Sequence, residues 1–121
     1  MAAVVLAVTL VPVGAAVAHG SCTPSVTSNP RAESGNVYGA GKIVCDSTHT
    51  ITITVSLQRR AADGSWDTRA SNTNQQGTVT QLQASVSTSG CQSGTWRTKV
   101  DGSTNHFSLI AVTNPGVTVS C

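Results

Sequence analysis

The side chains best suited to catalysis in this chain are two internal histidines and a handful of carboxylates. His49 and His106 offer ring bases, and Asp46 lies three residues before His49. A nucleophilic triad needs a Ser or Cys, a His and an orienting carboxylate in contact, but the sequence holds no G-x-S-x-G motif. Asp63 and Asp101 each precede a Gly, where Asp is a common turn residue. We therefore expect both histidines to lie in water at strand starts, and we expect neither catalytic residues nor an enzyme.

His19 is the residue whose position could create a metal site. Cleavage of a leader after Ala18 would leave His19 first in the chain, with an amine and a ring nitrogen for one ion. Such ligands suit copper, and His106 or His49 would be the second ligand. Secreted copper-holding sandwiches and copper-dependent polysaccharide oxygenases resemble this arrangement at their first residue, although Gly20-Ser21-Cys22 matches neither. Copper is thus the alternative to a protein without a cofactor.

Contact residues for a partner are expected among the aromatics and one basic doublet. Trp66 and Trp96 each sit inside a strand pattern beside Thr and aliphatic residues, which favours core packing. Tyr38, in N-V-Y-G-A-G, is the aromatic residue best placed for an exposed contact. Arg59 and Arg60 end a strand pattern and complete the expected binding set. The net charge of +2 and the lack of any other basic cluster argue against nucleic acid.

Four cysteines, Cys22, Cys45, Cys91 and Cys121, follow the leader. An even number in a small exported chain predicts two disulfides, whereas a zinc site would need closely paired ligands and no C-x-x-C occurs. Of three possible connectivities we favour Cys22–Cys45 and Cys91–Cys121, because each pair then brackets one strand-rich segment. Loops of this length would each contribute roughly 3–4 kcal/mol of stability.

Residues 1–18 are uncharged and mostly apolar, and they end in Ala16-Val17-Ala18, which is typical of a secretory signal peptide. The alternative is a membrane anchor, but Pro12 and Gly14 interrupt a run that is shorter than the roughly 20 apolar residues a span needs. Cleavage after Ala15 or Gly20 stays open. We expect a secreted protein that has no membrane contact once the leader is removed.

Strand signals fill the rest of the chain. Of the 103 residues after Ala18, 31 are Ser or Thr, which favours strands with a hydroxylated outer face over a helical core. One segment is apolar at every second position, at Ile51, Ile53, Val55 and Leu57, which predicts one buried and one wet face. We expect about seven strands and a closing edge, over residues 22–28, 36–45, 49–60, 65–71, 78–87, 94–100, 106–112 and 117–121.

Two segments carry a resemblance to a known family. L-Q-R-R-A-A-D-G-S-W-D-T-R-A-S (57–71) and S-G-C-Q-S-G-T-W-R-T-K-V-D-G-S (89–103) resemble the turn and the later strand of bacterial Ig-like domains. The resemblance implies an Ig-like antiparallel β-sandwich over residues 19–121. Two cysteine pairs depart from the single inter-sheet bridge of antibody domains. The chain also resembles the small two-disulfide exported proteins of high-GC Gram-positive bacteria.

These observations predict a small secreted binding or scaffolding module that engages a protein partner through its sheet edge and loops. The partner would be another secreted or cell-surface protein. An adaptor subunit of a secreted toxin or of a cell-wall-associated complex is a variant of this hypothesis. The sequence leaves the oligomeric state open.

Overall fold

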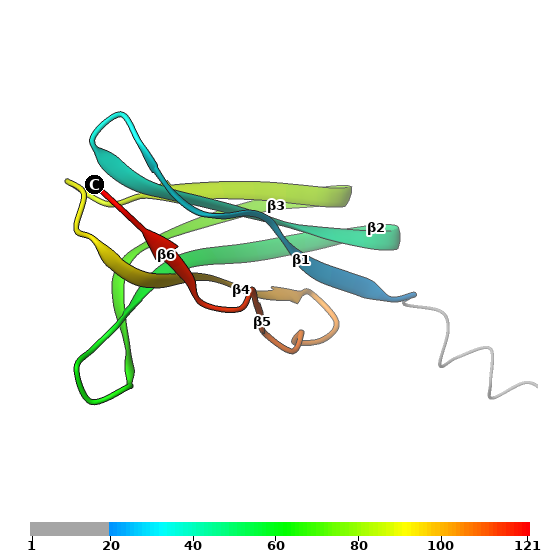
Figure 1. Ribbon diagram of the computed structural model, residues 1–121. Helices are drawn as coiled ribbons and strands as arrows, with labels where there is room; N and C mark the ends of the chain where they lie inside the picture. The colour runs from blue at the N-terminus through cyan, green and yellow to red at the C-terminus, as the bar shows by residue number, and fades with distance from the viewer. Residues whose placement is uncertain (1–19) are drawn as a thin grey trace, which may run out of the picture.

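The computed structural model describes residues 20–121, whose strands build one antiparallel sheet (Figure 1). The expected signal peptide, residues 1–18, and the expected metal ligand His19 lie outside the described residues. The described part is all-β, as predicted, with strands β1 (Cys22–Glu33), β2 (Asn36–Arg60), β3 (Trp66–Ser87), β4 (Gly94–Thr104), β5 (Val112–Thr113) and β6 (Val117–Val119). Between residues 20 and 121 there is no helix long and apolar enough to cross a membrane.

The alternation along β2 produces the core. Its inward side chains are fully buried at Ile43, Ile51, Ile53, Val55 and Leu57, while the threonines between them stay half-exposed on the outer face. Burial of each such aliphatic side chain stabilises the fold by roughly 1.5–3 kcal/mol. Trp96 and Val100 from β4 join the same cluster, so the prediction that Trp96 packs in the core is confirmed.

Strands β2 and β3 are long because each continues through a bend. The first half of β2 pairs with β1 and with the second half of β3, and its second half pairs with β4 and with the first half of β3. The β2–β3 register slips between Val44 and Ile51, and on the facing strand Thr78 has a φ of 57°. Backbone pairing resumes beyond the bend, so four of the predicted strands merge into two.

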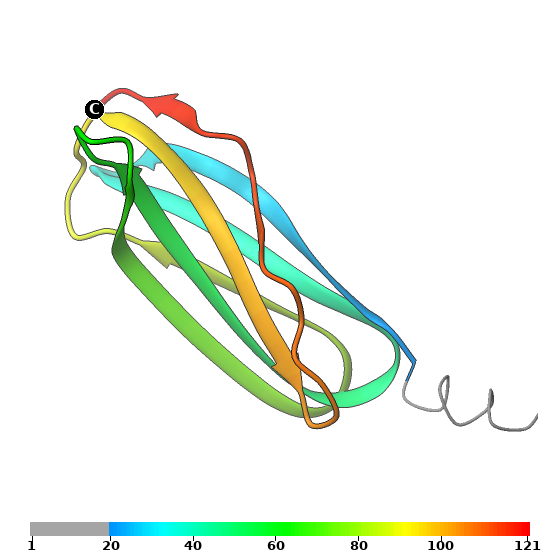
Figure 2. The same ribbon diagram turned by 90° about the horizontal axis from the view of Figure 1, so that it is seen from below.

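The sheet curls into a half-barrel (Figure 2). We expected about seven strands in two sheets, but six strands lie in one sheet. The predicted strand 106–112 is wrong, since Thr104 Oγ1 accepts hydrogen bonds from the backbone N–H groups of His106 and Phe107 and turns the chain there. Only a single bridge, Ser103 to Ser108, precedes β5 in this segment.

Small residues let the two halves of the curled sheet approach each other. A Cβ atom on Gly39 would lie only 2.6 Å from Thr98 Oγ1 and 2.9 Å from Leu57 Cδ2. Where backbone pairing stops, side-chain hydrogen bonds connect the two halves of β3. Asn72 Nδ2 and Asn74 Nδ2, in the first half of β3, donate to the carbonyls of Ser85 (2.9 Å) and Gln83 (3.1 Å) in its second half.

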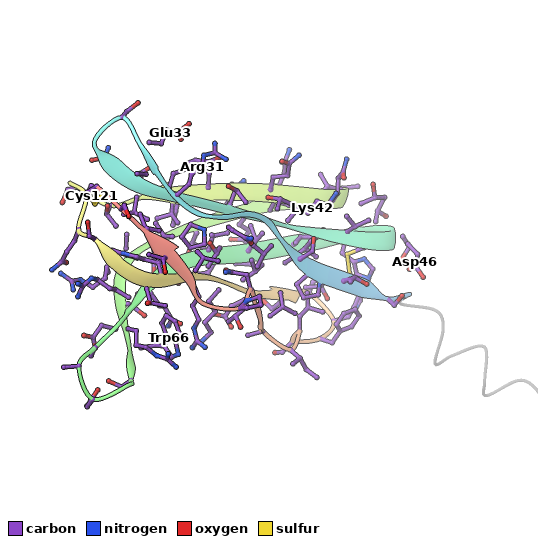
Figure 3. The ribbon with its side chains drawn as sticks, in the orientation of Figure 1. Arg31, Glu33, Lys42, Asp46, Trp66 and Cys121 are labelled. Carbon is purple, nitrogen blue, oxygen red and sulfur yellow. A yellow bond between two sulfur atoms is a disulfide. The ribbon has the colours of Figure 1, made fainter. Side chains whose placement is uncertain are left out.

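Both predicted disulfides are confirmed. Cys22–Cys45 joins residues that face each other on β1 and β2, and Cys91–Cys121 joins the β3–β4 connection to the last residue. The two lie at opposite ends of the elongated sheet, as the positions of Asp46, beside Cys45, and of Cys121 in Figure 3 show. The turns after β1 and β2 and the β3–β4 connection gather at the Cys121 end (Figure 1).

Candidate functional site

The two histidines meet at the Cys22–Cys45 end of the molecule. The ring centroids of His49 and His106 lie 5.6 Å apart. His49 is only 4% exposed, and its Nδ1 is 2.9 Å from the Ser47 carbonyl oxygen, so the expectation that it lies in water is wrong. The Asp46 carboxylate accepts hydrogen bonds from the backbone N–H (2.8 Å) and the hydroxyl (3.3 Å) of Ser21. Asp46, the carboxylate nearest His49 in sequence, therefore stabilises the chain at the start of β1.

The three predicted binding residues lie on different surfaces. Arg31 packs over the Tyr38 ring, 4.8 Å from its centroid, and Tyr38 borders a hollow of about 220 Å³ with Ala40 and Gln83 to Ser85. Arg59 Nε and Nη2 donate to the Ser93 carbonyl at 3.1 and 2.6 Å. The structure thus brings Arg59 to the β3–β4 connection and leaves Tyr38 on the opposite half of β2.

Arg60 belongs to a cluster on the outer face of the sheet. Its guanidinium carbon lies 5.1 Å from the centroid of the Trp66 ring, and that of Arg97 lies 4.5 Å from the same ring. Trp66 is half-buried, contacts two cations and lies outside the core cluster, so the prediction that it packs in the core is wrong. Arg97 Nε also donates to Gln58 Oε1 (2.7 Å), and Gln58 Nε2 donates to Thr68 Oγ1 (3.1 Å).

The β3–β4 connection, residues 88–93, has no regular structure but is tightly held; we call it the tethered loop. On one side it is fixed to the beginning of β2. The N–H of Thr88 donates to the Val37 carbonyl (2.9 Å), and the N–H of Val37 donates to Thr88 Oγ1 (3.0 Å). The N–H of Gly90 donates to Asn36 Oδ1 (2.8 Å), and Thr88 Oγ1 also lies within hydrogen-bond distance of the Gly90 carbonyl.

On its other side the tethered loop is fixed to β4 and to the end of the chain. Trp96 Nε1 donates to the Gln92 carbonyl (2.9 Å), and Arg59 holds the Ser93 carbonyl as described. The N–H of Cys121 donates to Ser93 Oγ (3.0 Å), and the disulfide closes the ring through Cys91. Loss of conformational freedom on binding is small for a segment that is already ordered. The tethered loop is therefore a preorganised surface.

A pocket of about 220 Å³ lies between the tethered loop and β3. Residues 88–92 form one side, and Arg69 and Trp96 complete the lining. Arg69 is the one charged side chain that lines it, and it sits where the β2–β3 register slips between Leu57 and Gln58. Exposed Ser89 and Gln92 supply neutral polar groups. A guanidinium beside hydroxyl and amide groups suits a carboxylate or another small anionic group.

The pocket adjoins a sheet edge that pairs with no further strand of the described sheet and is partly covered by side chains. Within the described sheet, β3 is hydrogen-bonded along one side only, to β2. Its first half is almost wholly exposed and carries only polar side chains from Ser71 to Thr78. The Asn72 and Asn74 side chains occupy two edge carbonyls, of Ser85 and Gln83, and this partial covering limits pairing with other chains.

Sequence reasoning missed the tethered loop and Arg69. The signals for them are spread through the chain, in Asn36, Arg59 and Trp96, and none of these forms a recognisable motif with T-S-G-C-Q-S. In comparisons with known proteins, no protein-family profile and no curated protein matches the sequence significantly.

Proposed function

We propose that this protein is a small, secreted, non-catalytic binding module that binds a protein partner through the tethered loop, Arg69 and the adjoining edge of β3. The observation that carries this proposal is that β2, β4 and Cys121 all hold residues 88–93 beside a charged pocket. Binding residues are commonly displayed on loops that a rigid scaffold positions. A partner segment with a carboxylate would place it at Arg69 while its backbone follows β3.

One further part of the proposal rests on the sequence resemblance, and another rests on the disulfides. The curled sheet would be a variant of the bacterial Ig-like domain, and two disulfides fit an oxidising extracellular compartment. An adaptor role in a secreted toxin or a cell-wall-associated complex would use the same surface. Fold likeness alone does not select among these roles.

Affinity capture from the native culture medium tests the proposal. The immobilised wild-type protein should return a stoichiometric protein partner. Arg69→Glu should weaken that binding by about tenfold or more, because a like charge would then face the partner's carboxylate. Arg31→Glu is the matched control: it makes the same charge change at an exposed arginine on β1 and should bind as the wild type does. Repeated capture without a partner would refute the proposal.

A second pair of variants tests the sheet edge. The carbonyls of Gln83 and Ser85 point away from β2, since Asn side chains reach them. Gln81 lies two residues before Gln83 on the same strand, so its backbone N–H also points away from β2. Gln81→Pro would remove an outward N–H without breaking the β2–β3 ladder. It should weaken partner binding, whereas Gln81→Ala should not. Equal binding by the two variants would exclude edge pairing at this position.

Copper binding is the second candidate function, and one observation favours it. The rings of His49 and His106 lie 5.6 Å apart, and a ring nitrogen of His49 lies within 4.8 Å of the sulfur of Cys22, the first residue of β1. His19, if it is the first residue of the mature chain, would then supply an amine and a ring nitrogen to the same ion. N-terminal sequencing of the secreted protein and paramagnetic resonance after addition of one equivalent of Cu²⁺ test this. A mature chain that starts elsewhere would exclude the combined amine and ring-nitrogen site at His19.

A further inference from the structure

Three side chains with metal-binding atoms gather at the first disulfide. One sulfur each from Cys22 and Cys45 and one ring nitrogen of His49 all lie within 4.8 Å of one another. In the oxidised protein the two sulfurs are bonded to each other and are not available as thiolates. We propose that reduction of this disulfide creates a binding site for one zinc ion, with Cys22, Cys45 and His49 as ligands.

The β1–β2 ladder would keep the two thiols together after reduction. Cys22 and Cys45 are direct partners in the antiparallel register, which continues with Thr23 opposite Val44 and then along both strands. Beyond the disulfide, the N–H of Asp46 donates to the Ser21 carbonyl (3.0 Å), and the Asp46 carboxylate accepts from the N–H of Ser21. The disulfide is thus flanked by backbone pairing on both sides, and its reduction leaves facing cysteines.

His49 is held in a suitable state for a metal. Its Nδ1 is 2.9 Å from the Ser47 carbonyl oxygen, which can only accept, so in the neutral ring Nδ1 is the donor and Nε2 carries the lone pair. Metal-binding histidines usually have their second nitrogen fixed in this way. His49 and Cys45 are 4% and 6% exposed, so these two ligands are shielded from bulk solvent.

The chemistry of the ligands selects the metal. Two thiolates and one imidazole are the ligand types of zinc sites, and a water molecule can fill the fourth position. The reductant is a dithiol: it gives two electrons and two protons to the Cys22–Cys45 bond and becomes a disulfide itself. Zinc then displaces one proton from each thiol, so binding releases two protons. A small-molecule disulfide that accepts two electrons from the two thiolates, and is itself cleaved to two thiolates, would restore the Cys22–Cys45 bond and release the ion.

The experiment uses the full chain with Cys91→Ser and Cys121→Ser, so that a single cysteine pair remains. The protein is reduced with a water-soluble phosphine, which takes up oxygen from water as its phosphine oxide, and is titrated with Co²⁺ and then Zn²⁺. We expect one Co²⁺ per chain, a thiolate-to-cobalt charge-transfer band that Zn²⁺ abolishes, and neither signal from the oxidised protein.

Two histidine variants test the ligand set. His49→Gln should weaken binding by about tenfold or more, whereas His106→Gln, an exposed neighbour, should retain it within about threefold. Absence of the charge-transfer band, or equal affinity of the His49→Gln and unsubstituted proteins, would overturn the proposal. If reduction unfolds the protein, Zn²⁺ should restore the circular-dichroism signal of the sheet; failure to restore it would also overturn the proposal.

Discussion

The guanidinium group of Arg97 makes two contacts at once: it lies 4.5 Å from the centroid of the Trp66 ring, and its Nε donates to Gln58 Oε1. Gln58 is 7% exposed although it belongs to the outer face. Its amide is satisfied on both sides, by Arg97 and by Thr68. The outer face is therefore held by side-chain bonds across three strands, and much of its polarity has a structural role.

We predict that Arg97→Ala lowers the free energy of unfolding by about 1–2 kcal/mol, because Gln58 Oε1 loses its donor and Trp66 loses a cation. Urea denaturation measures this. Lys99→Ala is the control: Lys99 lies two residues further along β4, and its 3.8 Å ion pair with Asp101 is solvent-exposed. It should cost less than about 0.5 kcal/mol. Equal losses would show that the Arg97 contacts contribute nothing specific.

Loss of the Cys91–Cys121 disulfide should loosen the tethered loop. Replacing both cysteines with Ser removes a cross-link between residues 30 apart in sequence, and stability should fall by roughly 3 kcal/mol. Amide hydrogen exchange at residues 88–93 should accelerate more than exchange in β2. The matched control replaces Cys22 and Cys45, which are 23 apart; it should cost similar stability without a selective effect on the loop. A loop unaffected by the first change would contradict its description as tethered.

Asp63 predicts a pH dependence of stability. The hydroxyl of Ser65 (2.6 Å) and then its N–H (2.9 Å) donate to the Asp63 carboxylate and lower the pKa of this carboxyl from 3.8. The pKa of Asp63 is lower in the folded protein than in the unfolded protein. The contribution of its carboxylate to stability is therefore complete above the unfolded-state pKa and is lost as the pH falls through the folded-state pKa. Wild type should therefore lose stability relative to Asp63→Asn as the pH falls below about 4.

Nuclear magnetic resonance titration of Asp63 checks the cause of this shift. In Ser65→Ala the main donor is gone, and the pKa of the Asp63 carboxyl should move back towards its usual value. An Asp63 pKa that is the same in wild type and Ser65→Ala would exclude the hydroxyl as the cause.

The strands and disulfides could be predicted from sequence because their signals are local. The apolar alternation from Ile51 to Leu57 identifies a buried face, and four cysteines bracket two segments. The number of strands was harder to predict from the sequence. The polar residues 46–48 and Gly77-Thr78 break the strand pattern in the sequence, yet the backbone pairs on both sides of each bend. Which segments form separate strands was therefore decided by pairing between distant residues.

The candidate site could not be predicted for a related reason. The tethered loop depends on partners far along the chain, such as Asn36, which is 54 residues from Gly90. Arg69 gives no local signal that distinguishes it from Arg59 or Arg60. The Arg59-Arg60 doublet was predicted to bind a partner because its two charges are adjacent, but the Arg59 guanidinium donates hydrogen bonds to the Ser93 carbonyl. Charge spacing alone does not reveal which guanidinium borders a pocket.

The curl of the sheet depends on close approach at Gly41. A Cβ atom there would overlap Val100 Cγ2 of β4 and lie 3.1 Å from the Ser25 carbonyl oxygen of β1. Val100 is fully buried in the core cluster, so a shift of its side chain would disturb its core neighbours. We predict that Gly41→Ala lowers the free energy of unfolding by about 1–3 kcal/mol through overpacking. Urea denaturation of the two proteins measures the difference.

Gly77→Ala is the matched control for this substitution. A Cβ on Gly77 would meet only Thr50 Oγ1, at 3.4 Å, an ordinary contact on the exposed first half of β3. Its φ is not in the left-handed range that alanine avoids. The change should be neutral or should stabilise by about 0.4–1 kcal/mol, because alanine restricts the unfolded chain. Equal destabilisation by the two substitutions would mean that the backbone freedom of glycine matters at both sites and that contact between the facing halves of the sheet does not set the cost at Gly41.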